Sequence, residues 1–329
     1  MIAQTNPSPE TQPEQPTPRP IEKWAALEGR WHFAPGEGYY LGPSKPESTI
    51  PFGLALGSIP FRDGSIRTSV RLARNECTSA GIAIGYQSMN AEWVSAQIGA
   101  HDRAYAISVY RPGVGWEAIA LAGLLSNVNL DQDHIMELTV AGQRVSMTVD
   151  DVRVFDLVLP KPLEGTGAGL FAWDDAKVVF TRTEVTTVRP RIFVIMPFAE
   201  PFDTLYREVI RPVAERLEFE IVRVDELEGP GIIVDDIQRQ ISQANAVVAE
   251  ISSRNPNVFY ELGYAHALEK PAVLLAKRES SGEMPFDIRG YRAIFYDDTI
   301  GGKKAVERSL EQHLRAVLGN ANTRGQLTI

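Results

Sequence analysis

Residues 189–198 have the sequence RPRIFVIMPF, and the pattern of the chain changes at this point. Residues 192–196 are a continuous apolar run, which is typical of a parallel strand buried on both faces. The residues that follow alternate helical and strand patterns. The sequence therefore predicts that a second domain begins here, covering residues 189–320.

The expected elements of this domain are strands that alternate with helices, except that no helix is expected between the last two strands. Its first strand is expected at residues 192–196. Further strands are expected at 219–224, 246–251, 272–276 and 293–296, with helices at 202–217, 232–243, 256–269 and 303–318. Five strands separated by helices predict a flavodoxin-like, doubly wound α/β domain with a five-stranded parallel sheet.

The region before residue 189 has a different pattern, with short segments in which apolar and polar residues alternate. Examples are residues 65–72, 80–86, 104–110 and 135–140. Turn-forming residues separate these segments, and no helical period persists for three turns. Residues 21–188 are therefore predicted to form an antiparallel β-sandwich of the jelly-roll type, which makes the chain multidomain.

The two ends of the chain are expected to be tails. Residues 1–20 contain six prolines among polar residues and are predicted to be disordered, because such a composition buries too little apolar surface. Residues 321–329 are assigned to a C-terminal tail. The total of 329 residues suits two domains of ordinary size.

Composition excludes several classes of protein. Thirty-three basic and 42 acidic residues give a formal charge of −9, so no dedicated nucleic-acid binding is expected. Cys77 is the single cysteine, has no zinc-site spacing and is interpreted as a small buried residue. No metal site is expected. Without a signal sequence or a long apolar run, the protein is expected to be cytoplasmic and to make no membrane contact.

The expected ligand site lies where the strand order of the parallel sheet reverses. In a 2-1-3-4-5 order, Met196, Pro197 and Phe198 would face Glu250 across that point. Asn255 is a good N-cap for the helix that follows, since Pro256 suits the first helical position. The start of this helix and the predicted pocket therefore coincide.

Glu261 is the candidate catalytic residue. Its helical neighbours Val258, Ala265 and Leu268 form an apolar stripe, so a carboxylate there must be paired, protonated or functional. The alternative is a glutamate stabilised by the helix dipole, but Glu261 lies beyond the first turn, where that effect fades. The two interpretations are evenly balanced on the residues alone.

Further candidate substrate-binding residues each have a simpler alternative. Asp225 follows the second strand and would hold ribose hydroxyls, or would lie in a solvated loop. Asn257 would bind the ribose or support the helix start. Asp287 and Arg289 lie in a loop after the fourth strand, where Arg289 would bind phosphate or pair with Asp287 on the surface.

The second half of the chain resembles a known superfamily. The run NPNVFYELGYAHAL at 255–268, with IFVIMPF at 192–198 and PFDIRGY at 285–291, is similar to the nucleoside 2-deoxyribosyltransferase-like and TIR-like nucleotide-binding proteins. The resemblance implies that Glu261 attacks or stabilises the anomeric carbon while an N-glycosidic bond breaks. It also implies a nucleotide ligand, and an effector role such as anti-phage defence.

In the deoxyribosyltransferase pattern acidic side chains handle the base at two positions, which here are Glu250 and Asn255, so the sequence departs from the pattern at Asn255. An asparagine cannot protonate a leaving base, which favours the cationic nicotinamide of NAD as the leaving group. The expected function is a nucleotide N-glycosidase of the NAD glycohydrolase type, with NAD as substrate and no cofactor. The alternatives are a non-catalytic nucleotide-signal receptor and a deoxynucleoside monophosphate N-glycosidase or deoxyribosyltransferase.

The first half resembles concanavalin-like sandwiches of the laminin-G-like branch. The segments that carry this resemblance are 64–70, 80–84, 140–147, 167–171 and 178–180. A carbohydrate or protein ligand is expected, with Trp93, Trp116 and Trp173 either stacking on sugar rings or packing in the core. This half has no pair of carboxylates of the kind that glycosidases use, so it is not expected to be an enzyme. A homo-oligomer is the expected assembly.

Overall fold

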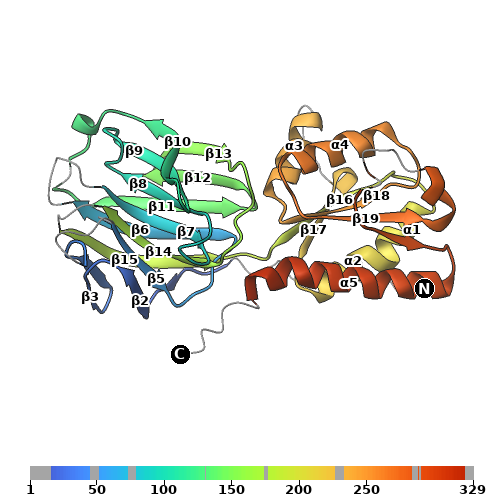
Figure 1. The fold of residues 1–329 in the computed structure, drawn as a ribbon, viewed down its shortest axis with the longest axis horizontal. Coiled ribbons are helices and arrows are strands. Elements are labelled where there is room, and N and C mark those ends of the chain that lie inside the picture. Colours follow the sequence, from blue (N-terminus) through green and yellow to red (C-terminus); the bar gives the residue numbers. More distant parts are fainter. Residues whose placement is uncertain are drawn as a thin grey trace, which may run out of the picture.

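The chain folds into two units, a β-sandwich and an α/β unit, which lie end to end in the computed structural model (Figure 1). The structure describes residues 16–44, 52–72, 79–129, 131–173, 177–226, 233–283, 288 and 290–322. Cys77, Asp287 and Arg289 lie outside these residues. The last strand of the sandwich ends at Thr187, and the first strand of the parallel sheet begins at Arg191.

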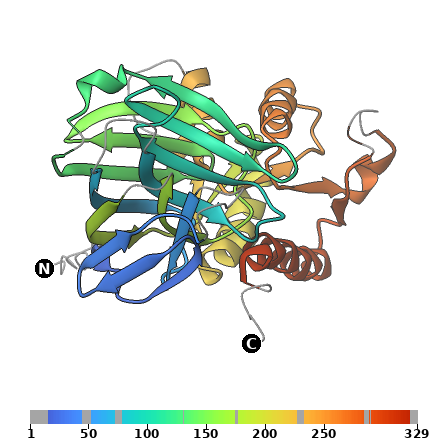
Figure 2. The same cartoon turned by 60° about the vertical axis from the view of Figure 1, so that its left-hand side comes forward.

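The sandwich consists of two antiparallel sheets. In order across the first sheet lie β13 (Val152–Val158), β12 (Arg144–Val149), β11 (His134–Ala141), β6 (Gly64–Leu72), β15 (Val178–Thr187), β4 (Glu37–Tyr40) and β3 (Trp31–Ala34), with β1 (Arg19–Pro20) paired to β15. In order across the second lie β10 (Gly115–Ala122), β9 (Tyr105–Arg111), β8 (Trp93–Ile98), β7 (Ser79–Tyr86), β14 (Gly167–Trp173), β5 (Phe52–Gly57) and β2 (Trp24–Glu28). Figure 2 shows these sheets beside the α/β unit.

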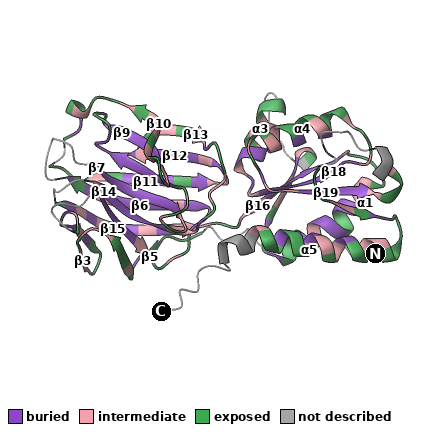
Figure 3. Cartoon of the chain, in the orientation of Figure 1, coloured by how far each residue is buried: buried purple, intermediate pink, exposed green. Residues whose placement is uncertain are grey.

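The core of the sandwich lies between the two sheets. Along β6, buried and more exposed residues alternate, and Ile66 and Val70 of β6 belong to the same buried cluster as Ile82 and Ile84 of β7. The middle strands of the second sheet, such as β7 and β14, appear as bands of buried residues in Figure 3. The alternation in burial matches the alternation of apolar and polar residues in the sequence. The predicted antiparallel β-sandwich is therefore confirmed.

The sandwich begins slightly earlier than predicted. Arg19 and Pro20, which the sequence pattern places in the tail, pair with Val185 and Glu184 of β15. Ile21 explains this attachment, because its side chain is buried and its N–H donates to the carbonyl oxygen of Thr183 at 3.0 Å.

The α/β unit has a parallel sheet with the order β17 (Glu220–Arg223), β16 (Arg191–Ile195), β18 (Ala246–Glu250), β19 (Ala272–Lys277) and β20 (Ala293–Tyr296). This is the 2-1-3-4-5 order, so the predicted doubly wound α/β fold is confirmed. Side chains of β16 enter two different cores, Ile192 on one face and Phe193 on the other. Burial on both faces explains the uninterrupted apolar run of this strand.

Helices cover both faces of this sheet (Figure 1). On one face lie α1 (Phe202–Leu205), a π-helical turn (Tyr206–Ile210), α2 (Arg211–Arg216) and α5 (Ile300–Asn322), and on the other lie α3 (Ile233–Gln243) and α4 (Pro256–Ala267). Short 3₁₀ turns occur at Leu125–Asn127, Val224–Glu226 and Arg278–Glu283. The single helix expected at 202–217 is thus interrupted by the π-helical turn.

Candidate functional site

The segments after β16 and β18 leave the parallel sheet at the same edge. The two strands are neighbours, with Ile195 in register with Ala249. Met196 is buried, Pro197 is half-buried and the Phe198 side chain is exposed. The topology therefore places residues 196–198 and Glu250 at one edge, where open parallel sheets bind their ligands.

The start of α4 is fixed by its N-cap. The side-chain oxygen of Asn255 accepts a hydrogen bond from the N–H of Asn257 at 2.9 Å, and Pro256 occupies the first turn. Asn255 is therefore a helix cap, as its sequence position indicates. The side chain of Asn257 is exposed to solvent.

Glu261 lies in the second turn of α4 and is half-buried. Its helical neighbours Val258, Leu262 and Ala265 are buried in the core beneath α4. Among the described residues, no side chain forms a hydrogen bond or an ion pair with its carboxylate. Desolvation alone raises the pKa of Glu261 from 4.5 to about 7. The carboxyl group is thus poised to change its charge near neutral pH.

Glu250 has a different environment, because it is enclosed by hydrogen-bond donors. Its carboxylate accepts hydrogen bonds from the N–H of Ser252 at 3.2 Å, from the Ser252 hydroxyl and from the Tyr296 hydroxyl at 3.0 Å. Burial raises the pKa of Glu250, while these hydrogen bonds and the charge of Lys277 oppose the rise. Glu250 consequently ties the end of β18 to β20.

Asp225 is held by a residue that the sequence did not single out. Arg223, the buried last residue of β17, donates to both carboxylate oxygens of Asp225 and, at 2.7 Å, to Asp203. Its guanidinium also lies 5.5 Å from the ring centroid of Phe198 and 4.3 Å from that of Tyr206. Arg223 therefore brings Asp225 and Phe198 together at the carboxyl ends of β17 and β16.

Glu261 is not linked by hydrogen bonds to the other predicted site residues that the structure describes. Within the described residues, no hydrogen bond or ion pair joins Glu261 to Glu250, Asp225 or Asn257. The positions of Asp287 and Arg289, which complete the predicted set, lie outside the described part of the chain. Arg223 has no distinctive signal in the sequence, because the same short strand also contains the charged Glu220.

The sandwich carries a separate pocket of about 300 Å³ on the outer side of its second sheet. Trp116, Trp173 and Phe171 line it together with Ser79 and Gln97, whose side chains are hydrogen-bonded to each other at 3.0 Å. Aromatic surfaces thus meet buried polar groups in a small cavity.

Of the three tryptophans considered from the sequence, Trp93 lies in a buried cluster with Phe52 and Phe171, separate from the core between the sheets. Its side chain is fully buried and packs edge-on against Trp116, with ring centroids 4.8 Å apart. The indole nitrogens of Trp93 and Trp116 are both buried, and neither has a hydrogen-bond partner within the described part of the chain.

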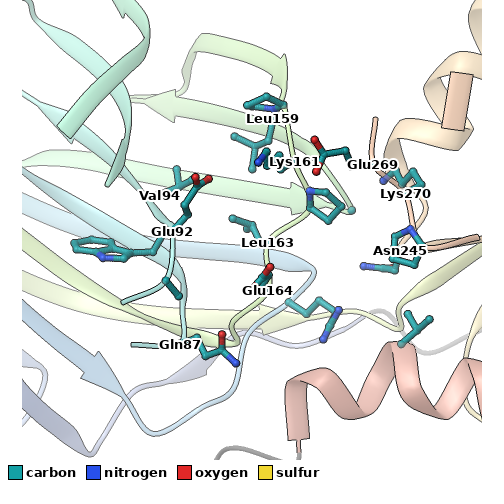
Figure 4. A pocket seen from close by; sticks show the side chains of 18 of the residues that line it. Gln87, Glu92, Val94, Leu159, Lys161, Leu163, Glu164, Asn245, Glu269 and Lys270 are labelled. Atoms are coloured by element: carbon teal, nitrogen blue, oxygen red, sulfur yellow. The ribbon is translucent and has the colours of Figure 1, made fainter. Parts of the chain in front are cut away.

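A larger cleft of about 1180 Å³ separates the two units. Figure 4 shows Lys161 and Glu164 from the sandwich facing Asn245, Glu269 and Lys270 from the α/β unit. The predicted site residues of the α/β unit are not among the side chains that line this cleft.

Comparison with known proteins gives matches among solved structures. No protein-family model and no curated protein matches the chain. Similar solved structures include the carbohydrate-binding module CBM66 from Bacillus subtilis (14% identity, TM-score 0.40, covering 50% of this chain and 95% of that one) and a prokaryotic β-1,3-1,4-glucanase from a mouse hindgut metagenome (13%, 0.38, 53% and 100%). Another is the galectin LEC-6 of Caenorhabditis elegans (14%, 0.31, 45% and 95%). Similarities at this level do not define a ligand or an activity for this chain.

The described ranges contain neither a candidate membrane span nor a candidate metal cluster. No helix in the described ranges is both long and apolar enough to cross a lipid bilayer. Within those same ranges, no three His, Cys, Asp or Glu side chains are grouped as metal ligands would be.

Proposed function

We propose that the α/β unit hydrolyses the N-glycosidic bond of a nucleotide, with Glu261 as the reacting carboxylate and NAD as the preferred substrate. The observation that supports this proposal is a half-buried carboxyl group without a charged or hydrogen-bonded partner among the described residues. Desolvating a carboxylate without compensation is unfavourable, so such groups are concentrated at functional sites.

The chemistry requires a carboxylate next to the anomeric carbon. When the C1′–N bond breaks, its electron pair leaves with the base and positive charge develops on the ribose. An ionised Glu261 offsets that charge or bonds to C1′, and water then releases the sugar. Because its pKa is about 7, a large fraction of Glu261 is ionised at neutral pH.

The residues at the helix start and at the end of β18 support a leaving group that needs no proton. The Asn255 amide has no acidic proton, and its oxygen is already bonded to the N–H of Asn257. Glu250 is occupied by Ser252 and Tyr296. A pyridinium becomes neutral nicotinamide on departure and needs no proton, whereas a purine or pyrimidine leaves as an anion unless it is protonated.

The substrate test compares NAD with deoxynucleoside monophosphates. The purified full chain is expected to release nicotinamide faster than any purine or pyrimidine base. Preferential release of a nucleobase, lost in Glu250→Gln, would replace this assignment with a deoxynucleoside monophosphate N-glycosidase. Saturable nucleotide binding without base release would indicate the non-catalytic receptor instead.

We also propose that the sandwich pocket binds a neutral, polar ligand with one apolar face, such as a carbohydrate unit. The aromatic walls of Trp116, Trp173 and Phe171 suit the apolar face, and Gln97 and Ser79 offer hydrogen bonds. Titration calorimetry with a panel of oligosaccharides tests this proposal. Binding that survives Trp116→Ala in a folded variant would place the ligand elsewhere.

A biological setting can be proposed from the resemblance of the α/β half. An NAD-consuming enzyme joined to a ligand-binding sandwich suits an effector in anti-phage defence, a role that rests on the resemblance of the α/β half alone. Light scattering of the same preparation tests whether the chain assembles as a homo-oligomer.

A further inference from the structure

The turn between β11 and β12 in the sandwich contacts the ends of two helices in the α/β unit. Gln143 is fully buried, and its N–H donates to the carbonyl oxygen of Ser242, near the end of α3, at 3.0 Å. Its side-chain Nε2 donates to the carbonyl oxygen of Leu268, the C-cap of α4, at 2.9 Å. The last carbonyls of a helix lack partners within it, so Gln143 supplies a capping donor to both helices.

The neighbouring glycine makes this approach possible. Gly142 has a φ of +57°, in the left-handed region that favours glycine. A Cβ atom at Gly142 would lie 2.5 Å from the carbonyl oxygen of Ala244 and 2.6 Å from that of Gln243. A side chain at residue 142 would therefore push the turn away from the end of α3.

The Gln143 side chain is specified by contacts outside its own turn. Nε2 lies between the carbonyl oxygens of Leu268 and Leu159, at 2.9 and 3.0 Å, so a flipped amide would place Oε1 against two acceptors. Oε1 itself is buried and has no partner among the described residues. An unsatisfied buried acceptor is destabilising, and an apolar residue at this position would avoid that penalty.

Other buried polar groups hold the junction on both sides. Asp63 of the sandwich accepts hydrogen bonds from the N–H of Gly142 at 2.5 Å and from Nδ2 of Asn245 at 2.7 Å. Lys270 Nζ donates to the carbonyl oxygens of Ser242, at 2.8 Å, and Ala244. Specific hydrogen bonds thus fix the position of the turn against the α/β unit.

The two capped helices are the ones next to the candidate site. Gln238 of α3 donates from Nε2 to the hydroxyl of Tyr260 in α4 at 3.2 Å, and Tyr260 precedes Glu261. We infer that the β11–β12 turn sets the position of α3 against α4, with Gln143 as a positioning residue for Glu261. The sandwich and the candidate site are thereby coupled. The part of this inference that concerns base release rests on the proposed function, whereas the coupling itself does not.

The test uses Gly142→Ala in the full chain, with Gly113→Ala as the matched control. Gly113 also has a positive φ, of +77°, but no atom lies within 4 Å of the point that its Cβ would occupy, so both variants carry backbone strain and only one clashes. The titration of the Glu261 carboxyl is followed by carbon-13 NMR, and base release is measured in parallel.

In Gly142→Ala, loosened packing admits water to Glu261, so its pKa is expected to fall from about 7 toward 4.5. Base release is expected to fall by up to about a hundredfold, because a reacting group misplaced by about 1 Å can lose that much rate. Gly113→Ala should resemble the wild type in both measurements. An unchanged Glu261 titration in folded Gly142→Ala would overturn the inference, whether or not the protein releases base.

Gln143→Met gives an independent test if Gly142→Ala does not fold. Methionine fills a similar volume and removes both the bond to Leu268 and the unsatisfied Oε1. The sandwich should remain folded while the Glu261 pKa shifts in the same direction. A wild-type titration in Gln143→Met would show that the turn does not position α4.

Discussion

Burial of the Glu261 carboxyl group raises its pKa, and this makes the stability of the folded chain depend on pH. Its pKa is about 7 in the folded chain and near the ordinary value of 4.5 once the chain unfolds. Between these values the folded state binds more protons than the unfolded state. The free energy of unfolding therefore decreases as the pH rises through this window.

Replacing the carboxyl group with an amide should remove that pH-dependent cost. Glu261→Gln is expected to be more stable than the wild type at pH 8, with the difference shrinking as the pH falls toward 4.5. Urea unfolding at several pH values measures the difference. Glu215→Gln, at an exposed position of α2, is the control and should show none. A constant difference across the pH range would contradict the assigned pKa.

Arg223 organises the edge of the sheet through two carboxylates. Arg223→Met leaves Asp203 and Asp225 without their shared cation and is expected to lower the free energy of unfolding by about 2–3 kcal/mol. This is below the largest values for broken ion pairs, because both carboxylates remain partly exposed. Arg216→Met, which breaks exposed pairs to α5, should cost less than about 1 kcal/mol. Equal losses would show that burial of Arg223 contributes nothing.

At the scale of the elements, α4 carries the candidate residue, and its start depends on a single cap. Asn255→Ala removes the acceptor for the N–H of Asn257 and is expected to cost about 1 kcal/mol of stability. Asn255→Asp keeps an acceptor and should cost much less. Chemical denaturation distinguishes the two variants, and equal stability of Asn255→Ala and the wild type would exclude a capping role.

The elements could be predicted from sequence because their signals are local. The apolar run of β16, the alternation in β6 and the Asn255–Pro256 start of α4 each report burial or capping within a few residues. The π-helical turn at Tyr206–Ile210 has no such signal, and it divides a segment expected to be one helix.

The candidate site is predictable only in part, because several of its contacts are distant in sequence. Glu261 stands out in the sequence as the interruption of an apolar stripe. Arg223 and Gln143 do not stand out, since their partners, such as Asp203 and Leu268, are 20 and 125 residues away. A single sequence contains no local pattern for contacts of this kind.

In the whole molecule, the sandwich supplies hydrogen-bond donors to the C-terminal ends of α3 and α4. A fragment of residues 188–329 loses Asp63 and Gln143, and it exposes Lys270 and Asn245. Calorimetry should show that the fragment unfolds cooperatively, at a lower temperature than the full chain. An unchanged melting temperature would mean that the junction contributes no stability to the α/β unit.

The central claim is that Glu261 breaks an N-glycosidic bond. The most direct measurement is nicotinamide release from NAD by the full chain between pH 5.5 and 8.5, for the wild type and Glu261→Gln, with Glu215→Gln as the control. We expect kcat/KM to rise with pH, with an apparent pKa near 7, because the reacting carboxylate must be ionised. We also expect a loss of at least about a hundredfold in Glu261→Gln, or about 2.7 kcal/mol of activation free energy. Wild-type turnover by folded Glu261→Gln would contradict the central claim.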